Sequence, residues 1–168
     1  MLHDPVIPLR EMRAVLALGS NLGDRQATLE GAVEDLRRTP GIMVDRVSSF
    51  TESVALTLHG EDASEPTYLN GVVIVRTVLR PRQLLAAVSN IENAHGRVRA
   101  ERWGSRTLDI DIITYGDLRQ DDDALTIPHP RAAERAFVLD PWLEIEPDAA
   151  IPGLGRIADL RARLEGDA

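Results

Sequence analysis

The sequence lacks cysteine entirely, and aromatic side chains make up only 4% of its 168 residues. Without cysteine, the protein forms no disulfide, uses no thiol nucleophile and binds no zinc through thiolates. Long apolar runs are also missing, because charges or prolines interrupt each stretch well short of the roughly 18 residues that a membrane-spanning helix needs. We therefore expect a cytoplasmic protein with no membrane partner.

The first residues differ from a secretory signal, because they hold two prolines and two acids and no sustained apolar core. We expect a disordered lead over residues 1–12 and a single domain over residues 13–168. A domain of this length buries about 70% of the surface of its unfolded chain, so its core needs neither metal nor disulfide. No long exposed apolar stripe is evident, and we expect a monomer.

The charge is unbalanced toward acid, with 27 acidic against 19 basic side chains and a net charge of -8. Proteins that bind nucleic acid generally neutralise several phosphates with excess Lys and Arg. We therefore expect no nucleic-acid partner, although a local basic cluster can override the global sign.

Hydrophobic patterning predicts alternating strands and helices in the first part of the chain. Residues 14–18 are a continuous apolar run of strand length, and residues 19–24 are rich in turn formers. A helix capped by Asp24 is expected over residues 25–38, where apolar side chains recur every three or four positions. Residues 42–50 alternate in the manner of a second strand.

The middle of the chain continues the alternation after a polar interruption. Residues 57–66 lack periodicity, and we expect a solvated mobile loop there. The β-branched run within residues 68–78 predicts a third strand. A second helix is expected over residues 81–95, an irregular charged stretch over 97–106 and a fourth strand over 107–115.

This order of strand, helix, strand, strand, helix and strand predicts an α+β fold of the ferredoxin-like type. Its sheet is antiparallel, and two helices pack on one face. The rest of the chain is expected to be a C-terminal extension with short helical pieces near residues 132–135 and 157–164.

Two carboxylates lie side by side in the fourth expected strand. Asp109 and Asp111 are two residues apart and so face one side of the strand, whereas Leu108, Ile110 and Ile112 face the other. The apolar bulk of this strand favours a central place in the sheet. Such a carboxylate pair is tolerated on a wet face or when cations bridge it. Mg²⁺ is suited to the second case, because it takes one or two carboxylates together with substrate phosphates.

A group of four arginines precedes the carboxylates, namely Arg97, Arg99, Arg102 and Arg106. Guanidinium groups present forked donors that match phosphate oxygens. Alone, the group is equally well explained as a solvated basic loop. Beside a carboxylate pair, it favours a site for phosphoryl transfer.

Four further side chains are candidates for binding. Trp103 lies among the arginines and either packs onto the sheet or stacks on a flat heterocycle. Tyr68 and Asn70 share a face of the third strand, and Asn70 offers a donor and an acceptor to an amide-bearing ring. His129, between two prolines, is a general base, a phosphate contact or a loop residue.

Several short motifs occur along the chain in a fixed order. They are Ala-Leu-Gly-Ser-Asn-Leu-Gly-Asp at residues 17–24, Tyr-Leu-Asn at 68–70, Gly-Arg-Val-Arg at 96–99, Glu-Arg-Trp-Gly-Ser-Arg-Thr-Leu-Asp-Ile-Asp at 101–111, Ile-Pro-His-Pro at 127–130 and Arg-Ala-Phe-Val-Leu at 135–139. With these motifs the chain resembles the 6-hydroxymethyl-7,8-dihydropterin pyrophosphokinase family of folate biosynthesis, which moves a pyrophosphoryl group from ATP to a pterin alcohol.

The resemblance implies a ferredoxin-like core that binds the co-substrate ATP, two Mg²⁺ ions and the pterin in a cleft on the sheet. It places the metals on Asp109 and Asp111 and ties Arg97 and Arg106 most closely to the transfer step. The pterin is expected between Trp103 and Phe137, with Tyr68 and Asn70 near it. The implied ATP contacts are Leu85, Glu92, Arg99, Arg102, Trp103, Arg106, Ile112, Thr126, His129 and Arg135.

The chain departs from the family pattern after the second strand. The family usually carries a tyrosine, a threonine, a proline and a glycine where this chain has residues 51–57, and Ser53 stands in place of the threonine. We expect the same chemistry with an altered wall of the pterin pocket.

Two rival hypotheses belong to other classes. A ferredoxin-like fold with a surface aromatic and arginines can bind single-stranded RNA, although the net charge of -8 disfavours it. The other rival is a catalytically silent homologue that retains nucleotide, which nucleotide binding without AMP release would identify.

Overall fold

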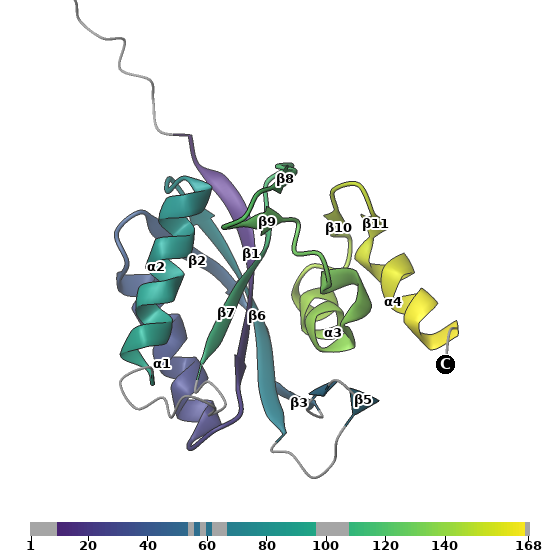
Figure 1. Ribbon diagram of the computed structural model, residues 1–168, viewed down its shortest axis with the longest axis horizontal. Coiled ribbons are helices and arrows are strands. Elements are labelled where there is room, and N and C mark those ends of the chain that lie inside the picture. Colours follow the sequence, from purple (N-terminus) through teal and green to yellow (C-terminus); the bar gives the residue numbers. More distant parts are fainter. Residues whose placement is uncertain (1–9, 54–55, 58–59, 62–66, 97–107, 167–168) are drawn as a thin grey trace, which may run out of the picture.

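The computed structural model describes residues 10–53, 56–57, 60–61, 67–96 and 108–166 (Figure 1). The main sheet contains β1 (Met12–Ser20), β2 (Ile42–Val47), β3 (Thr51–Ser53), β6 (Tyr68–Thr77) and β7 (Asp109–Tyr115). The helices are α1 (Arg25–Arg38), α2 (Pro81–Ala94), α3 (Ala136–Ile145) and α4 (Ile157–Gly166), with a 3-10 turn η2 (Ala132–Glu134) before α3. Short strand pairs join β4 (Leu56–Thr57) to β5 (Gly60–Glu61), β8 (Gln120–Asp121) to β9 (Thr126–Ile127) and β10 (Ala150–Ile151) to β11 (Gly155–Arg156).

The main sheet is antiparallel, with the strand order β2–β6–β1–β7, and β3 pairs with the first residues of β6. Helix α1 connects β1 to β2, and α2 connects β6 to β7. This is the ferredoxin-like arrangement that the sequence predicts. The expectation that the strand of Asp109 is central was wrong, because β7 lies at the end of the strand order. Among the described strands of the main sheet, β7 pairs only with β1, and its apolar residues are buried because helices cover both faces of the sheet.

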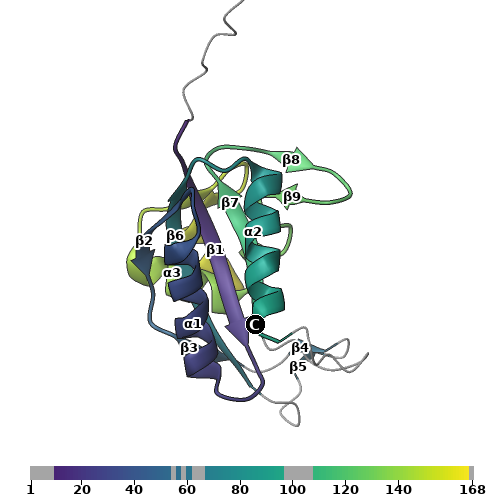
Figure 2. The same cartoon turned by 90° about the vertical axis from the view of Figure 1, so that its left-hand side faces the viewer.

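Helices α1 and α2 cover one face of the sheet, and Figure 2 shows them in front of it. The Asp24 side chain caps α1 by accepting a hydrogen bond from the Ala27 N–H at 3.0 Å, as predicted. Helix α1 spans the expected residues, and α2 ends at Ala94, one residue before the expected end. The helix residues that pack into this core are Leu29, Ala32, Val33, Leu36, Leu84, Val88 and Ile91.

The chain after β7 covers the opposite face of the sheet. Helix α3 buries Val138, Leu139 and Trp142 against Val72 and Ile74 of β6. The 3-10 turn η2 and helix α4 add to this second core, and they match the two helical pieces expected in the extension. Helix α3 was not predicted. The C-terminal part therefore forms one of the two hydrophobic cores, the one on the face of the sheet opposite α1 and α2.

Several expected boundaries shift. Strand β1 extends to Ser20, so Gly19 is in the sheet and not in a turn. The second strand ends at Val47. At the next residue, the Ser48 N–H donates to the carbonyl oxygen of Val72, and the Val72 N–H donates to Ser48 Oγ, so a side chain replaces one backbone partner of the regular pairing. Pairing with β6 resumes in β3. Within the segment expected to be an irregular loop, Thr57 pairs with Gly60.

No helix in the part of the chain that the structure describes is long and apolar enough to cross a membrane. Most of the expected lead over residues 1–12 falls outside the described residues, and β1 begins at Met12.

Candidate functional site

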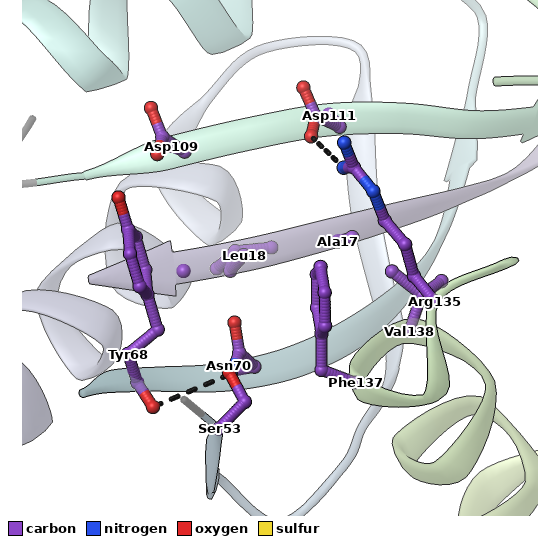
Figure 3. Close-up of a pocket in the computed structure, with 11 residues that line it drawn as sticks. Ala17, Leu18, Ser53, Tyr68, Asn70, Asp109, Asp111, Arg135, Phe137 and Val138 are labelled. Carbon is purple, nitrogen blue, oxygen red and sulfur yellow. Dashed lines mark hydrogen bonds and ion pairs between the residues drawn. The ribbon is translucent and has the colours of Figure 1, made fainter. Parts of the chain in front are cut away.

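A cavity of about 220 Å³ lies on the sheet face that α3 covers, where β1, β6 and β7 run side by side (Figure 3). The three strands supply its floor, β3 supplies one wall, and the start of α3 supplies the opposite wall. The lining residues are Ala17, Leu18, Gly19, Ser53, Tyr68, Asn70, Asp109, Asp111, Arg135, Phe137 and Val138. Six of them belong to the sites predicted from sequence, namely Tyr68, Asn70, Asp109, Asp111, Arg135 and Phe137.

The carboxylates of β7 point into this cavity. Asp109 and Asp111 are both partly exposed, and the intervening Ile110 is buried in the core on the α1 and α2 side. The predicted alternation is therefore confirmed. The two acids form one side of the cavity, where a solvated cation and phosphate oxygens can reach both.

Strand β1 lies between β7, which carries the carboxylates, and β6, which carries the polar side chains. It contributes the smallest residues of the cavity floor. Gly19 of β1 stands directly opposite Asn70 on one side and Asp109 on the other. A Cβ on Gly19 would lie 3.2 Å from Asn70 Oδ1 and 3.5 Å from a ring carbon of Tyr68. Ala17 stands opposite Asp111 in the same way. Small side chains at these positions keep the floor open between the two functional walls.

Asn70 is buried and held by several hydrogen bonds. Its Nδ2 donates to Ser53 Oγ at 2.6 Å, and longer contacts join it to the carbonyl oxygens of Thr51 at 3.5 Å and Tyr68 at 3.4 Å. The sequence predicted that Asn70 offers a donor and an acceptor together. The structure commits the donor to Ser53 and Tyr68, so Oδ1, which lies over Gly19, is the atom that faces the cavity.

The start of α3 supplies a cation and an aromatic ring. Arg135 Nη1 lies 4.0 Å from Asp111 Oδ2, and the guanidinium carbon of Arg135 lies 5.5 Å from the centroid of the Phe137 ring. The arginine thus contacts both the carboxylate of β7 and the aromatic wall. Since α3 was not predicted, only the structure explains how these two side chains reach the sheet.

His129 and Thr126 line a second cavity, of about 440 Å³, between the β8–β9 and β10–β11 pairs. The His129 N–H donates to the carbonyl oxygen of Ile113, which places His129 beside the outer edge of β7. Burial lowers the pKa of His129, the Asp111 carboxylate partly offsets this, and Arg135 and Arg131 lower it further. The net effect favours the neutral form of the ring.

Three predicted ATP contacts lie on the α2 side of the sheet and do not line the carboxylate cavity. Glu92 Oε2 accepts a hydrogen bond from the Ile110 N–H at 3.1 Å. Leu85 packs against the core from α2, and the Ile112 side chain is buried within that core. The structure places them next to β7, on the face opposite Asp109 and Asp111.

Five predicted site residues, Arg97, Arg99, Arg102, Trp103 and Arg106, lie outside the described residues. Their roles stay predictions. Sequence reasoning missed Ala17, Leu18, Gly19 and Val138 as cavity residues. They carry no polar side chain that signals a binding role, and only strand pairing and α3 bring them to the site.

Within the described ranges, no group of three or more His, Asp or Glu side chains is placed to hold a metal ion. The cavity offers two carboxylates, Asp109 and Asp111. This donor set is too small for an all-protein cage. It fits Mg²⁺, which usually keeps several waters and completes its shell with phosphate oxygens of a substrate.

Comparisons with known proteins agree with the geometry. Residues 15–147 match the family model described as 7,8-dihydro-6-hydroxymethylpterin-pyrophosphokinase. The chain is 43% identical over 143 residues to a 2-amino-4-hydroxy-6-hydroxymethyldihydropteridine pyrophosphokinase of Synechocystis sp., covering 85% of this chain and 71% of that protein. It is 45% identical over 141 residues to the protein of the same name from Methylorubrum extorquens, covering 84% and 87%.

Among solved structures, the chain is similar to wild-type HPPK-DHPS of Plasmodium falciparum with pterin and p-hydroxybenzoate. The TM-score is 0.70 at 16% identity, and the match covers 94% of this chain and 44% of that one. The chain thus spans less than half of the solved protein, and the likeness concerns the fold.

Proposed function

The chain belongs to the 7,8-dihydro-6-hydroxymethylpterin-pyrophosphokinase family, and on that premise we propose that it transfers pyrophosphate from ATP to 6-hydroxymethyl-7,8-dihydropterin in folate biosynthesis. The products are the pterin diphosphate and AMP. The observation that carries this proposal is the single cavity that joins two carboxylates of β7 to a polar wall on β6 and an aromatic wall on α3.

In the proposed reaction, the hydroxymethyl oxygen of the pterin attacks the β-phosphorus of ATP. The new bond joins that oxygen to the β-phosphorus, and the bond between the β-phosphorus and the oxygen bridging to the α-phosphate breaks, so AMP leaves. The hydroxyl proton goes to solvent, because a carboxylate that holds a metal ion is a poor base. The protein contributes positioning and charge neutralisation, since phosphoryl transfer needs little covalent chemistry from side chains.

Asp109 and Asp111 are the proposed ligands of two Mg²⁺ ions, which would neutralise the charge on the phosphate oxygens. The support is their common face on β7 and their place in one cavity. Arg135 keeps a positive charge 4.0 Å from Asp111, where it can pair with a phosphate oxygen once substrate enters. Arg97 and Arg106 remain the residues proposed to act most directly on the transfer.

The pterin is proposed to lie over Gly19 and against Phe137. Asn70 Oδ1 would accept a hydrogen bond from a ring N–H, because its Nδ2 already donates to Ser53. Tyr68 closes the end of the same cavity, and Trp103 is proposed to cover the other face of the ring. An aromatic ring against a flat heterocycle gives contact area at small entropic cost.

Among the described residues, the proposed ATP contacts lie in three places. Arg135 belongs to the carboxylate cavity, and Thr126 and His129 to the neighbouring one. Leu85, Glu92 and Ile112 lie on the α2 side of β7. Arg99, Arg102, Trp103 and Arg106 complete the proposed set.

The deciding experiment measures AMP formation from ATP and Mg²⁺ with and without 6-hydroxymethyl-7,8-dihydropterin. We expect AMP only when the pterin is present, with one pterin diphosphate formed per AMP. Formation of ADP would show an ordinary kinase. Nucleotide binding without any product would show a silent homologue.

We also propose that the protein acts as a monomer in the cytoplasm, where its nucleotide donor is available. Among the described residues the exposed large hydrophobic side chains are Leu22, Met43 and Leu154, which are far apart in the chain and belong to three different elements or turns. Sedimentation velocity at micromolar protein should give a single species of the monomer mass of 18.5 kDa.

A further inference from the structure

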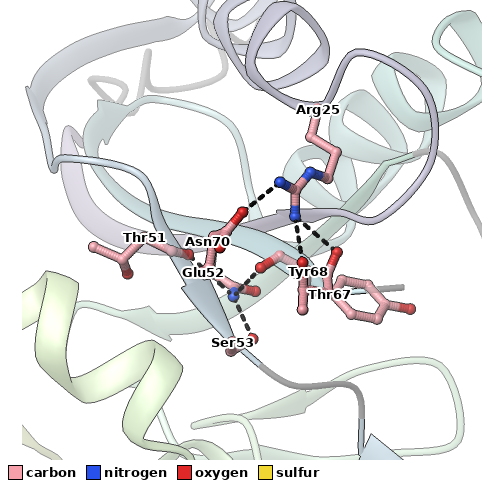
Figure 4. Close-up of polar contacts among 7 residues, drawn as sticks. All are labelled: Arg25, Thr51, Glu52, Ser53, Thr67, Tyr68 and Asn70. Carbon is pink, nitrogen blue, oxygen red and sulfur yellow. Dashed lines mark hydrogen bonds and ion pairs between the residues drawn. The ribbon is translucent and has the colours of Figure 1, made fainter. Parts of the chain in front are cut away.

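Arg25, at the start of α1, forms hydrogen bonds with a residue of β3 and with the residue directly before β6 (Figure 4). Arg25 Nη1 donates to the carbonyl oxygen of Thr67 at 2.9 Å and to Thr67 Oγ1 at 2.8 Å. Its Nη2 donates to Glu52 Oε1 at 2.5 Å. One guanidinium therefore contacts β3 and the residue directly before β6.

The backbone of Arg25 is fixed by its place in a capped helix. Arg25 is the first residue of α1, whose N-terminus is capped by the Asp24 side chain. The guanidinium is planar and holds its donors in a fixed fork, so three acceptors on two segments are kept in one geometry. A lysine at the same position would present a single point charge and could not span both segments equally.

The two contacted residues stand next to the polar wall of the cavity. Glu52 precedes Ser53, and Thr67 precedes Tyr68; Ser53 and Tyr68 are partners in the β3–β6 pairing. The Ser53 Oγ accepts the 2.6 Å hydrogen bond from Asn70 Nδ2. This is the shortest of the Nδ2 contacts described above, so the position of Ser53 helps to orient the Asn70 amide.

We propose that Arg25 is a positioning residue for the pterin end of the cavity, acting through Glu52 and Thr67 on Ser53 and Asn70. This inference rests on the proposed function. Arg25 does not line the cavity, so it acts on substrate only through the residues it holds. Its side chain is 26% exposed and that of Glu52 is 62% exposed, and exposed ion pairs add little to global stability. The fold should therefore survive its removal.

The test compares Arg25→Ala and Arg25→Lys with Arg161→Ala as a matched control. Arg161 is 25% exposed and donates to Asp140 at 2.6 Å, on the α4 side of the molecule and away from the cavity. We expect Arg25→Ala to raise the KM for the pterin about tenfold, because a displaced Asn70 weakens one hydrogen bond to the substrate. The KM for ATP, kcat at saturation and Tm should stay close to wild type. Arg25→Lys should recover only part of the loss, and Arg161→Ala should change neither KM.

A second readout follows the Asn70 side chain directly. In ¹H–¹⁵N spectra, the Asn70 amide protons should shift in Arg25→Ala and remain in place in Arg161→Ala. An unchanged pterin KM in Arg25→Ala, or equal rises in the KM values for pterin and ATP, would overturn the positioning role. The absence of pterin-dependent AMP from the wild-type protein would instead refute the proposed function, so the two failures are distinguishable.

Discussion

Replacing Gly19 by alanine tests whether the pterin lies on the floor of the cavity. The added methyl group would sit 3.2 Å from Asn70 Oδ1 and 3.5 Å from a Tyr68 ring carbon. The first distance is short by a few tenths of an ångström, so Asn70 must move by that amount. The methyl also occupies the space directly between the Asn70 and Asp109 strands.

The magnitude follows from this crowding. When the pterin fills the cavity over Gly19, inserting a methylene-sized group beneath it costs about 1–3 kcal/mol, and about 1.4 kcal/mol corresponds to a tenfold change in an equilibrium constant. Because Asn70 needs to move so little, we expect the lower part of that range and a rise of about tenfold in the KM for the pterin. In the strand itself, alanine is favoured over glycine by roughly 0.5–1 kcal/mol, which offsets part of the strain on the fold.

The assay is steady-state AMP release with the pterin varied at saturating ATP, and then with ATP varied at saturating pterin. Gly166→Ala is the control, because a Cβ on that residue meets no atom within 4 Å. The control should match wild type in both KM values. An unchanged pterin KM in Gly19→Ala, at a Tm close to that of wild type, would refute the placement of the pterin over Gly19.

Three further predictions concern the metal site, the second core and the β8–β9 turn. Asp109→Ala and Asp111→Ala should each abolish turnover while leaving Tm near wild type, and near-normal rates in either variant would contradict the two-metal proposal. Leu139→Ala should lower the free energy of unfolding, measured by urea titration, by about 2–5 kcal/mol, because it truncates a fully buried leucine. Leu36→Ala, on the opposite face of the sheet, is the comparison. A far smaller effect at Leu139 than at Leu36 would show that α3 is peripheral to the core. Backbone N–H groups of Leu125 and Ala124 lower the pKa of Asp122, so its stabilising effect is present above the usual value of 3.8 and is lost as the pH falls through the lowered pKa. Asp122→Ala should therefore lower Tm at pH 7 but not at a pH below that pKa, and a Tm difference that persists in acid would refute this assignment.

The sequence alone determined those features that depend on local periodicity. The two-residue spacing of Asp109 and Asp111 forces both carboxylates onto one face of any strand, and the structure shows them there. The recurrence of apolar residues between Arg25 and Arg38 specified α1, with Asp24 as its cap. The alternation of strands and helices was enough for the ferredoxin-like order, because short connections leave few alternative topologies.

The tertiary structure alone decided which distant side chains meet. Strand register set Gly19 between Asn70 and Asp109, and no local pattern in the sequence encodes pairing between residues that far apart. Helix α3 contains Pro141, which breaks the usual helical signal, and it forms because Val138, Leu139 and Trp142 are buried against the sheet. That packing brings Arg135 and Phe137 to the carboxylates. Local sequence thus determined the elements and the chemistry they carry, whereas burial and strand pairing across the whole chain assembled the cavity.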